Sequence, residues 1–119
     1  HTGAGIPFAD PVSVTDVAKD FSQVKIILAH SGSDMFVQQA LNLAKDRKNV
    51  YLEPSWLNII NTRSLLKEVG PEKIMFSSDH AINVPVELTK YRTLIEDEVK
   101  LNQVLSETAI EVFALQVNN

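Results

Sequence analysis

Three side chains in this sequence belong to types that bind metal ions or transfer protons, and each is expected where a parallel strand ends. His30 directly follows the apolar run 26–29, and Asp79 follows the apolar stretch 73–77. His1 would take the same position if a strand preceded it. In parallel sheets and barrels, ligands bind at the carboxyl ends of the strands. The sequence therefore predicts one site built from these ends.

Imidazole nitrogen and carboxylate oxygen form the ligand set of catalytic zinc, manganese and iron sites. A metal ion there would lower the pKa of bound water from about 15.7 to near 7. A carboxylate beside that water could take its proton, and a second histidine could stabilise an oxyanion or protonate a leaving group. Two plainer interpretations stay open: His30 as a hydrogen-bonded histidine at the rim of the core, and Asp79 as a cap of the next helix.

Three neighbours of these residues have simpler expected roles. Glu53 also ends a predicted strand, but the following Pro54 suits a turn equally well. Because side chains alternate along a strand, His80 is expected to point to the opposite side from Asp79 and to lie at the rim. Trp56 is expected in the core or in a pocket wall.

The elements that position these residues alternate along the chain. Short apolar runs rich in β-branched residues predict strands at 24–29, 49–53 and 73–77. Periodic apolar residues and stop signals such as Gly70-Pro71 predict helices at 11–20, 34–48, 59–69, 86–99 and 101–115. This order predicts parallel βαβ units with consecutive strands as neighbours.

Two helices carry finer expectations. In the segment 11–20, one buried face is expected to hold Val14, Val17, Ala18 and Phe21. Ser33 is expected to cap the helix at 34–48. The last helix is expected to break into two pieces near residues 106–108.

Composition limits the class of protein. At 119 residues the chain is one domain or part of one. Eleven basic and fifteen acidic side chains give a net charge of -4, which favours neither nucleic acid nor an anionic membrane surface as a partner. The sequence lacks an apolar run of the roughly 20 residues that a membrane span needs. With no cysteine, a cytoplasmic protein is expected. The expected partner is a small-molecule substrate.

Taken together, the segments resemble the amidohydrolase superfamily, in its amidohydrolase-related branch of hydrolases and metal-dependent aromatic-acid decarboxylases. The likeness rests on His1-Thr2-Gly3, on the stretches 24–32, 48–56 and 69–79, and on the tail from Val104 through Ala109 to Phe113. It covers nearly the whole chain but only the second half of the family domain. Residues 1–119 are therefore expected to be the C-terminal half of an amidohydrolase-like TIM-barrel domain.

The resemblance implies an α/β fold, a partial (β/α)8 barrel comprising strands six to eight with their helices. It implies that His30 ends strand six, that residues 50–53 are strand seven and that Asp79 ends strand eight. His1 would end strand five. The implied metal ligands are His1, His30 and Asp79, and the implied cofactor is a divalent metal ion, zinc in our prediction. Asp79 would also accept the proton, while His30 would bind a second metal or act as acid and base.

The sequence departs from the family pattern at Ser77, Ala81 and Thr108, where the family usually has Gly, Pro and Asn. These positions bear on the subgroup and leave the metal residues untouched. The expected function is a metal-dependent hydrolase; the alternatives are a non-oxidative decarboxylase and a non-catalytic half-barrel module. The family's His-x-His pair is absent, and ordering His1 at a chain end costs entropy, so little activity is expected of this chain alone. The open barrel edges predict self-association.

Overall fold

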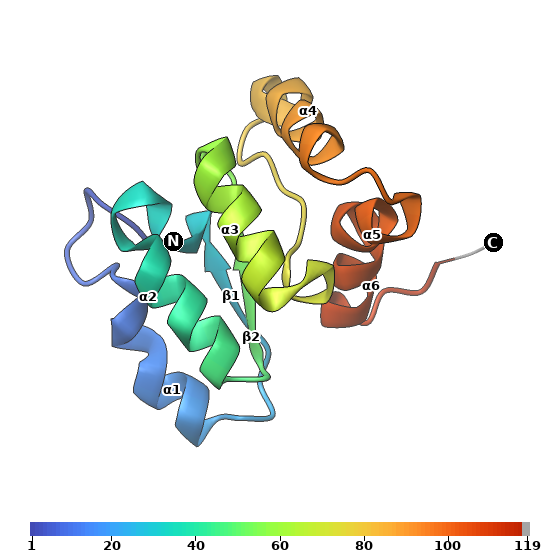
Figure 1. Ribbon diagram of the computed structural model, residues 1–119. Helices are drawn as coiled ribbons and strands as arrows, with labels where there is room; N and C mark the ends of the chain where they lie inside the picture. Colours follow the sequence, from blue (N-terminus) through green and yellow to red (C-terminus); the bar gives the residue numbers. More distant parts are fainter. Residues whose placement is uncertain (118–119) are drawn as a thin grey trace.

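The computed structural model of the protein describes residues 1–117, in which two short parallel strands pack against a set of helices (Figure 1). The strands are β1 Ile26–Ala29 and β2 Val50–Glu53, with Ile26 opposite Val50 and Ala29 opposite Glu53. Leu28 and Leu52 are paired in this register, and both are buried. Alternation along the strands thus places large apolar side chains on one covered face.

Helices account for most of the regular structure. They are α1 Thr15–Asp20, α2 Ser33–Asp46, α3 Ile59–Val69, α4 Val84–Leu94, α5 Glu98–Asn102 and α6 Thr108–Phe113. Short 3-10 turns cover Pro11–Val14, His30–Gly32, Pro71–Lys73 and Ala81–Asn83, and a π turn at Gln103–Glu107 joins α5 to α6. In Figure 1, α2 and α3 lie side by side over the strands, and α4 to α6 extend beyond α3. None of the helices within residues 1–117 combines the length and the apolarity needed to cross a bilayer.

The core lies between the strands and these helices. Leu28, Leu52, Leu65 and Ile74 are almost completely buried, and Tyr91 joins them from α4. The burial of these side chains supplies the main free energy that holds the helical layer on the sheet.

Two helix predictions can be compared directly with the structure. The predicted helix 59–69 is confirmed as α3, with Asn58 capping its start and Gly70, at φ 80°, following its end. The helix at 11–20 is only partly confirmed, because its first four residues form a 3-10 turn. Val17 and Phe21 are about half exposed, so the predicted buried face is wrong at these positions. The contact with α2 is made mainly by the 3-10 turn rather than by α1.

The predicted strand at 73–77 is wrong. An isolated bridge joins Ile74 to Leu52, and the Met75 amide donates to the Leu52 carbonyl at 2.9 Å. The next amide, that of Phe76, donates instead to the carbonyl of Val104 in the π turn, at 2.9 Å. The backbone thereby leaves the ladder after one bridge, and the described residues form an α/β fold with a two-stranded sheet rather than three strands.

The C-terminal helices differ in their boundaries. The predicted helix 86–99 is observed as α4, which ends at Leu94, and the predicted helix 101–115 is observed as α5, the π turn and α6. The expected break into two pieces near residues 106–108 is wrong, because the helix continues through the π turn into α6 with right-handed helical backbone angles at Glu107 and Thr108. The last two residues of the predicted domain 1–119 lie outside the described residues.

Candidate functional site

Three residues that follow β1, β2 and the segment bridged to β2 have backbone angles in the left-handed region. His30 has φ 63°, Trp56 φ 65° and Asp79 φ 61°. These residues follow β1, β2 and the segment that bridges to β2. A non-glycine residue in this conformation costs about 1–3 kcal/mol and persists only where its surroundings fix it; such residues gather at functional sites. Ser31 and Ser33, beside His30, also have positive φ, so five of the seven such non-glycine residues in the described part of the chain lie near the edge that the sequence predicts as the site; Phe8 and Ala114 lie elsewhere.

His1 is held beside His30 by the residue that follows it. The Thr2 amide donates to the Ala29 carbonyl at 2.9 Å, and the Thr2 hydroxyl donates to the same oxygen at 2.7 Å. The hydroxyl also accepts from the Gly32 amide at 2.9 Å. The two imidazole rings lie edge to face, with their centroids 4.9 Å apart. Thr2 thus fastens the chain start to the end of β1, which lowers the entropy cost expected for ordering His1.

His30 is oriented by two residues at the end of β2. Its Nδ1 lies 2.8 Å from Ser55 Oγ, and its amide donates to Glu53 Oε2 at 3.1 Å. Glu53 Oε1 in turn accepts from the Ser55 amide at 2.8 Å. A hydrogen bond at Nδ1 fixes the ring and directs Nε2 toward a ligand or a proton. Glu53 is buried and holds the backbone of His30 and of Ser55. Its position at the end of a buried strand therefore indicated its role better than the turn expected at Pro54.

Asp79 is held by the residue next to Ser55. Trp56 Nε1 donates to Asp79 Oδ2 at 2.9 Å, and His80 Nε2 lies 3.7 Å from the same oxygen. Trp56 is 55% exposed and lines a cavity of about 510 Å³ beside α4, so of its two expected places it occupies a pocket wall rather than the core. His80 is exposed at the rim as predicted, yet it lies near Asp79 rather than opposite, because residues 79–80 bend instead of alternating as a strand.

One loop thus contacts two of the predicted residues. Ser55 contacts His30 and the adjacent Trp56 contacts Asp79, so both side chains belong to the same edge of the fold. His1 and His30 are brought together directly.

The donor types at this edge suit a divalent cation, and Ser31 Oγ, next to His30, is buried without a partner in the described part of the chain. Within residues 1–117, however, no three His, Asp or Glu side chains gather into a group able to hold a metal ion. His1 and His30 fit as two ligands, whereas Asp79 lies with the indole of Trp56 and does not complete a set of three. The assignment of all three as ligands stays a prediction.

The rim of this edge is tied together by Asp34, at the start of α2. Its Oδ1 accepts from Asn58 Nδ2 at 2.7 Å and from Asn61 Nδ2 at 2.9 Å. Burial opposes ionisation of Asp34, but these hydrogen bonds outweigh it and leave the pKa of the carboxyl below its ordinary value. The first turns of α2 and α3 are thereby joined next to the loop that carries Ser55 and Trp56.

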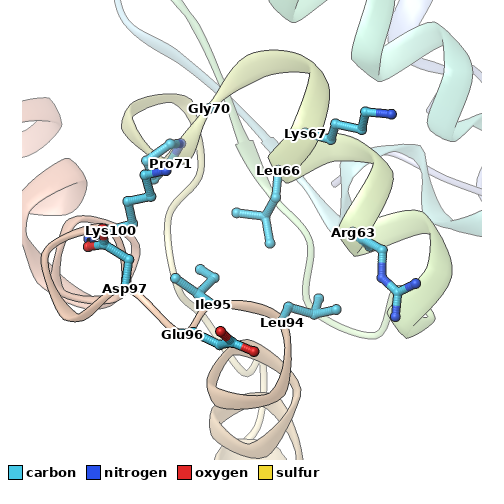
Figure 2. Close-up of a pocket in the computed structure, with 10 residues that line it drawn as sticks. All are labelled: Arg63, Leu66, Lys67, Gly70, Pro71, Leu94, Ile95, Glu96, Asp97 and Lys100. Carbon is cyan, nitrogen blue, oxygen red and sulfur yellow. Dashed lines mark hydrogen bonds between the residues drawn. The ribbon is translucent and has the colours of Figure 1, made fainter.

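Other cavities lie away from this loop. A cavity of about 660 Å³ lies between the C-terminal half of α3 and the connection from α4 to α5, with Leu66 and Ile95 pointing into it (Figure 2). This end of α3 lies away from the carboxyl ends of the strands, and none of the predicted site residues lines this cavity. An apolar cavity of about 470 Å³ is lined by the loop after Thr2, including Phe8, and by Met35 of α2.

Comparison with known proteins gives the family. A family model described as Amidohydrolase matches residues 1–115. The chain belongs to the amidohydrolase family. No curated protein matches the sequence.

Solved structures of related fold are also found. One is 5-carboxyvanillate decarboxylase LigW from Sphingomonas paucimobilis, with 19% identity and a TM-score of 0.67 over 88% of this chain and 38% of that chain. Another is 2,6-dihydroxybenzoate decarboxylase in complex with 2,6-dihydroxybenzoate, with 15% identity and a TM-score of 0.67 over 88% of this chain and 40% of that chain. This amidohydrolase-family chain therefore shares the fold of part of these enzymes and spans about two fifths of their length.

Proposed function

We propose that the protein is a metal-dependent hydrolase and that this chain supplies His1, His30 and Asp79 to its active site. The observation that supports the proposal is the single loop at Ser55 and Trp56, which fixes His30 and Asp79 at one edge where the backbone is strained. The match to the Amidohydrolase family model supports the same reading. The proposed cofactor is a divalent metal ion, zinc by preference, for which this chain would supply His1 and His30 as ligands, with Asp79 as the base beside it.

Each residue has a task in this proposal. When bound, such a cation lowers the pKa of a coordinated water to near 7. Asp79 accepts the proton of the attacking water, and the Trp56 indole holds the carboxylate oxygen in place. The side chain of Asp79 is 41% exposed, so water reaches it. His30, fixed at Nδ1 by Ser55, uses Nε2 to hold the cation or to protonate the leaving group.

Non-oxidative decarboxylation is the second candidate. It is favoured by the two solved structures, whose names describe decarboxylases of aromatic acids. The same three residues would serve, with His30 or Asp79 giving a proton to the carbon that loses carbon dioxide. Product mass separates the two reactions, because hydrolysis adds the mass of water and decarboxylation removes that of carbon dioxide.

The test uses the whole protein that contains this chain. Its metal content is measured by mass spectrometry, and its activity is assayed on esters, amides and aromatic acids. We expect Asp79→Asn to lower kcat by about 100- to 10,000-fold, because a positioned acid or base contributes that much. Asp16→Asn is the matched control, because Asp16 is exposed on α1, and its kcat should stay within a few-fold of the parent. A protein that holds no metal and turns over none of these substrates would favour a non-catalytic half-barrel, and full activity in Asp79→Asn would refute the role of Asp79.

A further inference from the structure

We propose that Glu87 and Lys90, a buried ion pair on α4, position the loop that orients both His30 and Asp79. This inference rests on the proposed function for the roles of those two residues. Neither Glu87 nor Lys90 contacts His30 or Asp79 in the described hydrogen bonds and ion pairs, so they are positioning residues rather than catalytic ones.

The pair is unusual because of its burial. Glu87 is 2% exposed and Lys90 is 8% exposed, and the ammonium of Lys90 contacts Glu87 Oε2. Charged side chains are almost never this buried unless they are paired, and a buried pair adds little net stability over an apolar one. Geometry rather than stability is therefore the better explanation for placing two charges here.

The two charged groups form hydrogen bonds with the backbone of the loop at 54–57. Lys90 Nζ donates to the carbonyl of Pro54 at 3.2 Å and to that of Leu57 at 2.9 Å. Glu87 Oε1 accepts from the Trp56 amide at 3.0 Å. The residues on both sides of Ser55 and Trp56 are thus bonded to one helix. These hydrogen bonds account for the left-handed backbone conformation of Trp56, which persists only where its surroundings fix it.

The same pair reaches the segment that carries Asp79. Asn83 Nδ2 donates to Glu87 Oε1 at 3.3 Å and to the carbonyl of Ser78, the residue before Asp79, at 3.1 Å. Glu87 therefore links the loop that donates to Asp79 with the backbone from which Asp79 projects. A displacement of Glu87 would move the indole of Trp56 relative to the carboxylate, and the hydroxyl of Ser55 relative to His30.

The first test is spectroscopic and does not depend on activity. Trp56 is the one tryptophan of the sequence, so its indole N–H signal in a ¹⁵N-tryptophan spectrum reports the bond to Asp79. Glu87→Gln, which preserves shape, and Lys90→Met are expected to shift this signal and to speed its exchange with water. The controls are Arg92→Met, an exposed cation of the same helix, and Val104→Ala, a core change outside the loop. Both controls should leave the signal in place.

The second test is kinetic and uses the whole protein. Misplacing a catalytic group by about 1 Å costs up to about 100-fold in rate, so we expect kcat to fall about 10- to 100-fold in Glu87→Gln and Lys90→Met, with KM changed less than about threefold. An unchanged indole signal in either folded variant would overturn the proposal, and so would the same shift in Val104→Ala. A protein without detectable activity would refute the proposed function, while the indole signal would still decide the role of the pair.

Discussion

Lys73→Met is predicted to destabilise the protein far more than an ordinary lysine substitution. Lys73 Nζ donates to the carbonyl oxygens of Arg47 at 2.9 Å, Lys48 at 2.9 Å and Val50 at 2.7 Å. It also lies 5.0 Å from the centroid of the Tyr51 ring. The side chain thereby ties the segment after α3 to the start of β2, where the chain makes only one bridge of a regular ladder.

The magnitude follows from two opposing contributions. Hydrogen bonds to a charged group contribute about 1.5–3 kcal/mol each, and three are lost in the variant. Desolvation of the ammonium opposes them, and it lowers the pKa of Lys73 below its ordinary value. Methionine removes the charge but leaves three carbonyl groups with one fewer partner. We therefore expect Lys73→Met to lower the free energy of unfolding by about 2–4 kcal/mol.

The measurement is urea unfolding followed by far-UV circular dichroism and by the fluorescence of Trp56. Lys67→Met is the matched control, because Lys67 is an exposed lysine of α3, and it should change stability by less than about 0.5 kcal/mol. If the two variants unfold at the same urea concentration, the three carbonyl contacts do not stabilise the fold as argued.

Three further outcomes are expected. Tyr91→Phe should leave stability unchanged or raise it by up to about 1 kcal/mol, because the Tyr91 hydroxyl is buried without a partner in the described part of the chain. Burial and nearby carboxylates raise the pKa of Tyr91, so unfolding studied by circular dichroism should become easier as pH rises above about 10, and less so in the variant. Asp34→Ala should cost about 1–2 kcal/mol in urea, since it removes the bonds to Asn58 and Asn61. The pKa of Asp34 is lowered on folding, so its contribution is present above the unfolded pKa and should be lost as pH falls below about 4, a loss that the variant should not show. Finally, the chain should self-associate with a second copy through the edge of β1 that faces away from β2, and light scattering that gives the monomer mass at every concentration would contradict this.

Local signals predicted the helical layer well. The helix 59–69 was predicted with its observed end because Gly70-Pro71 is a stop signal within the segment itself, and the structure adds Asn58 as the cap at its start. The segment 73–77 has an equally clear strand pattern, yet its backbone turns to Val104 after one bridge. That choice depends on a residue about thirty positions away, which the pattern of a short segment does not contain.

The sequence predicted that His30 and Asp79 lie at one edge of the fold, because the ends of apolar runs are visible in it. His30 and Asp79 follow apolar runs, and the structure joins their segments through Ser55 and Trp56. The supporting residues were missed. Glu87 and Lys90, three positions apart on a helix, have the spacing of an ordinary surface ion pair, and their burial follows only from how α4 packs over the loop.

The central claim is that His1, His30 and Asp79 lie around one cation-binding site at the carboxyl ends of the strands. The most direct measurement is a titration with Mn²⁺, whose unpaired electrons broaden nearby NMR signals. We predict that the imidazole signals of His1 and His30 and the indole signal of Trp56 broaden first and together, and that Asp79→Asn weakens the effect. Broadening that begins at other residues, or that leaves His30 and Trp56 sharp at saturating Mn²⁺, would contradict the account.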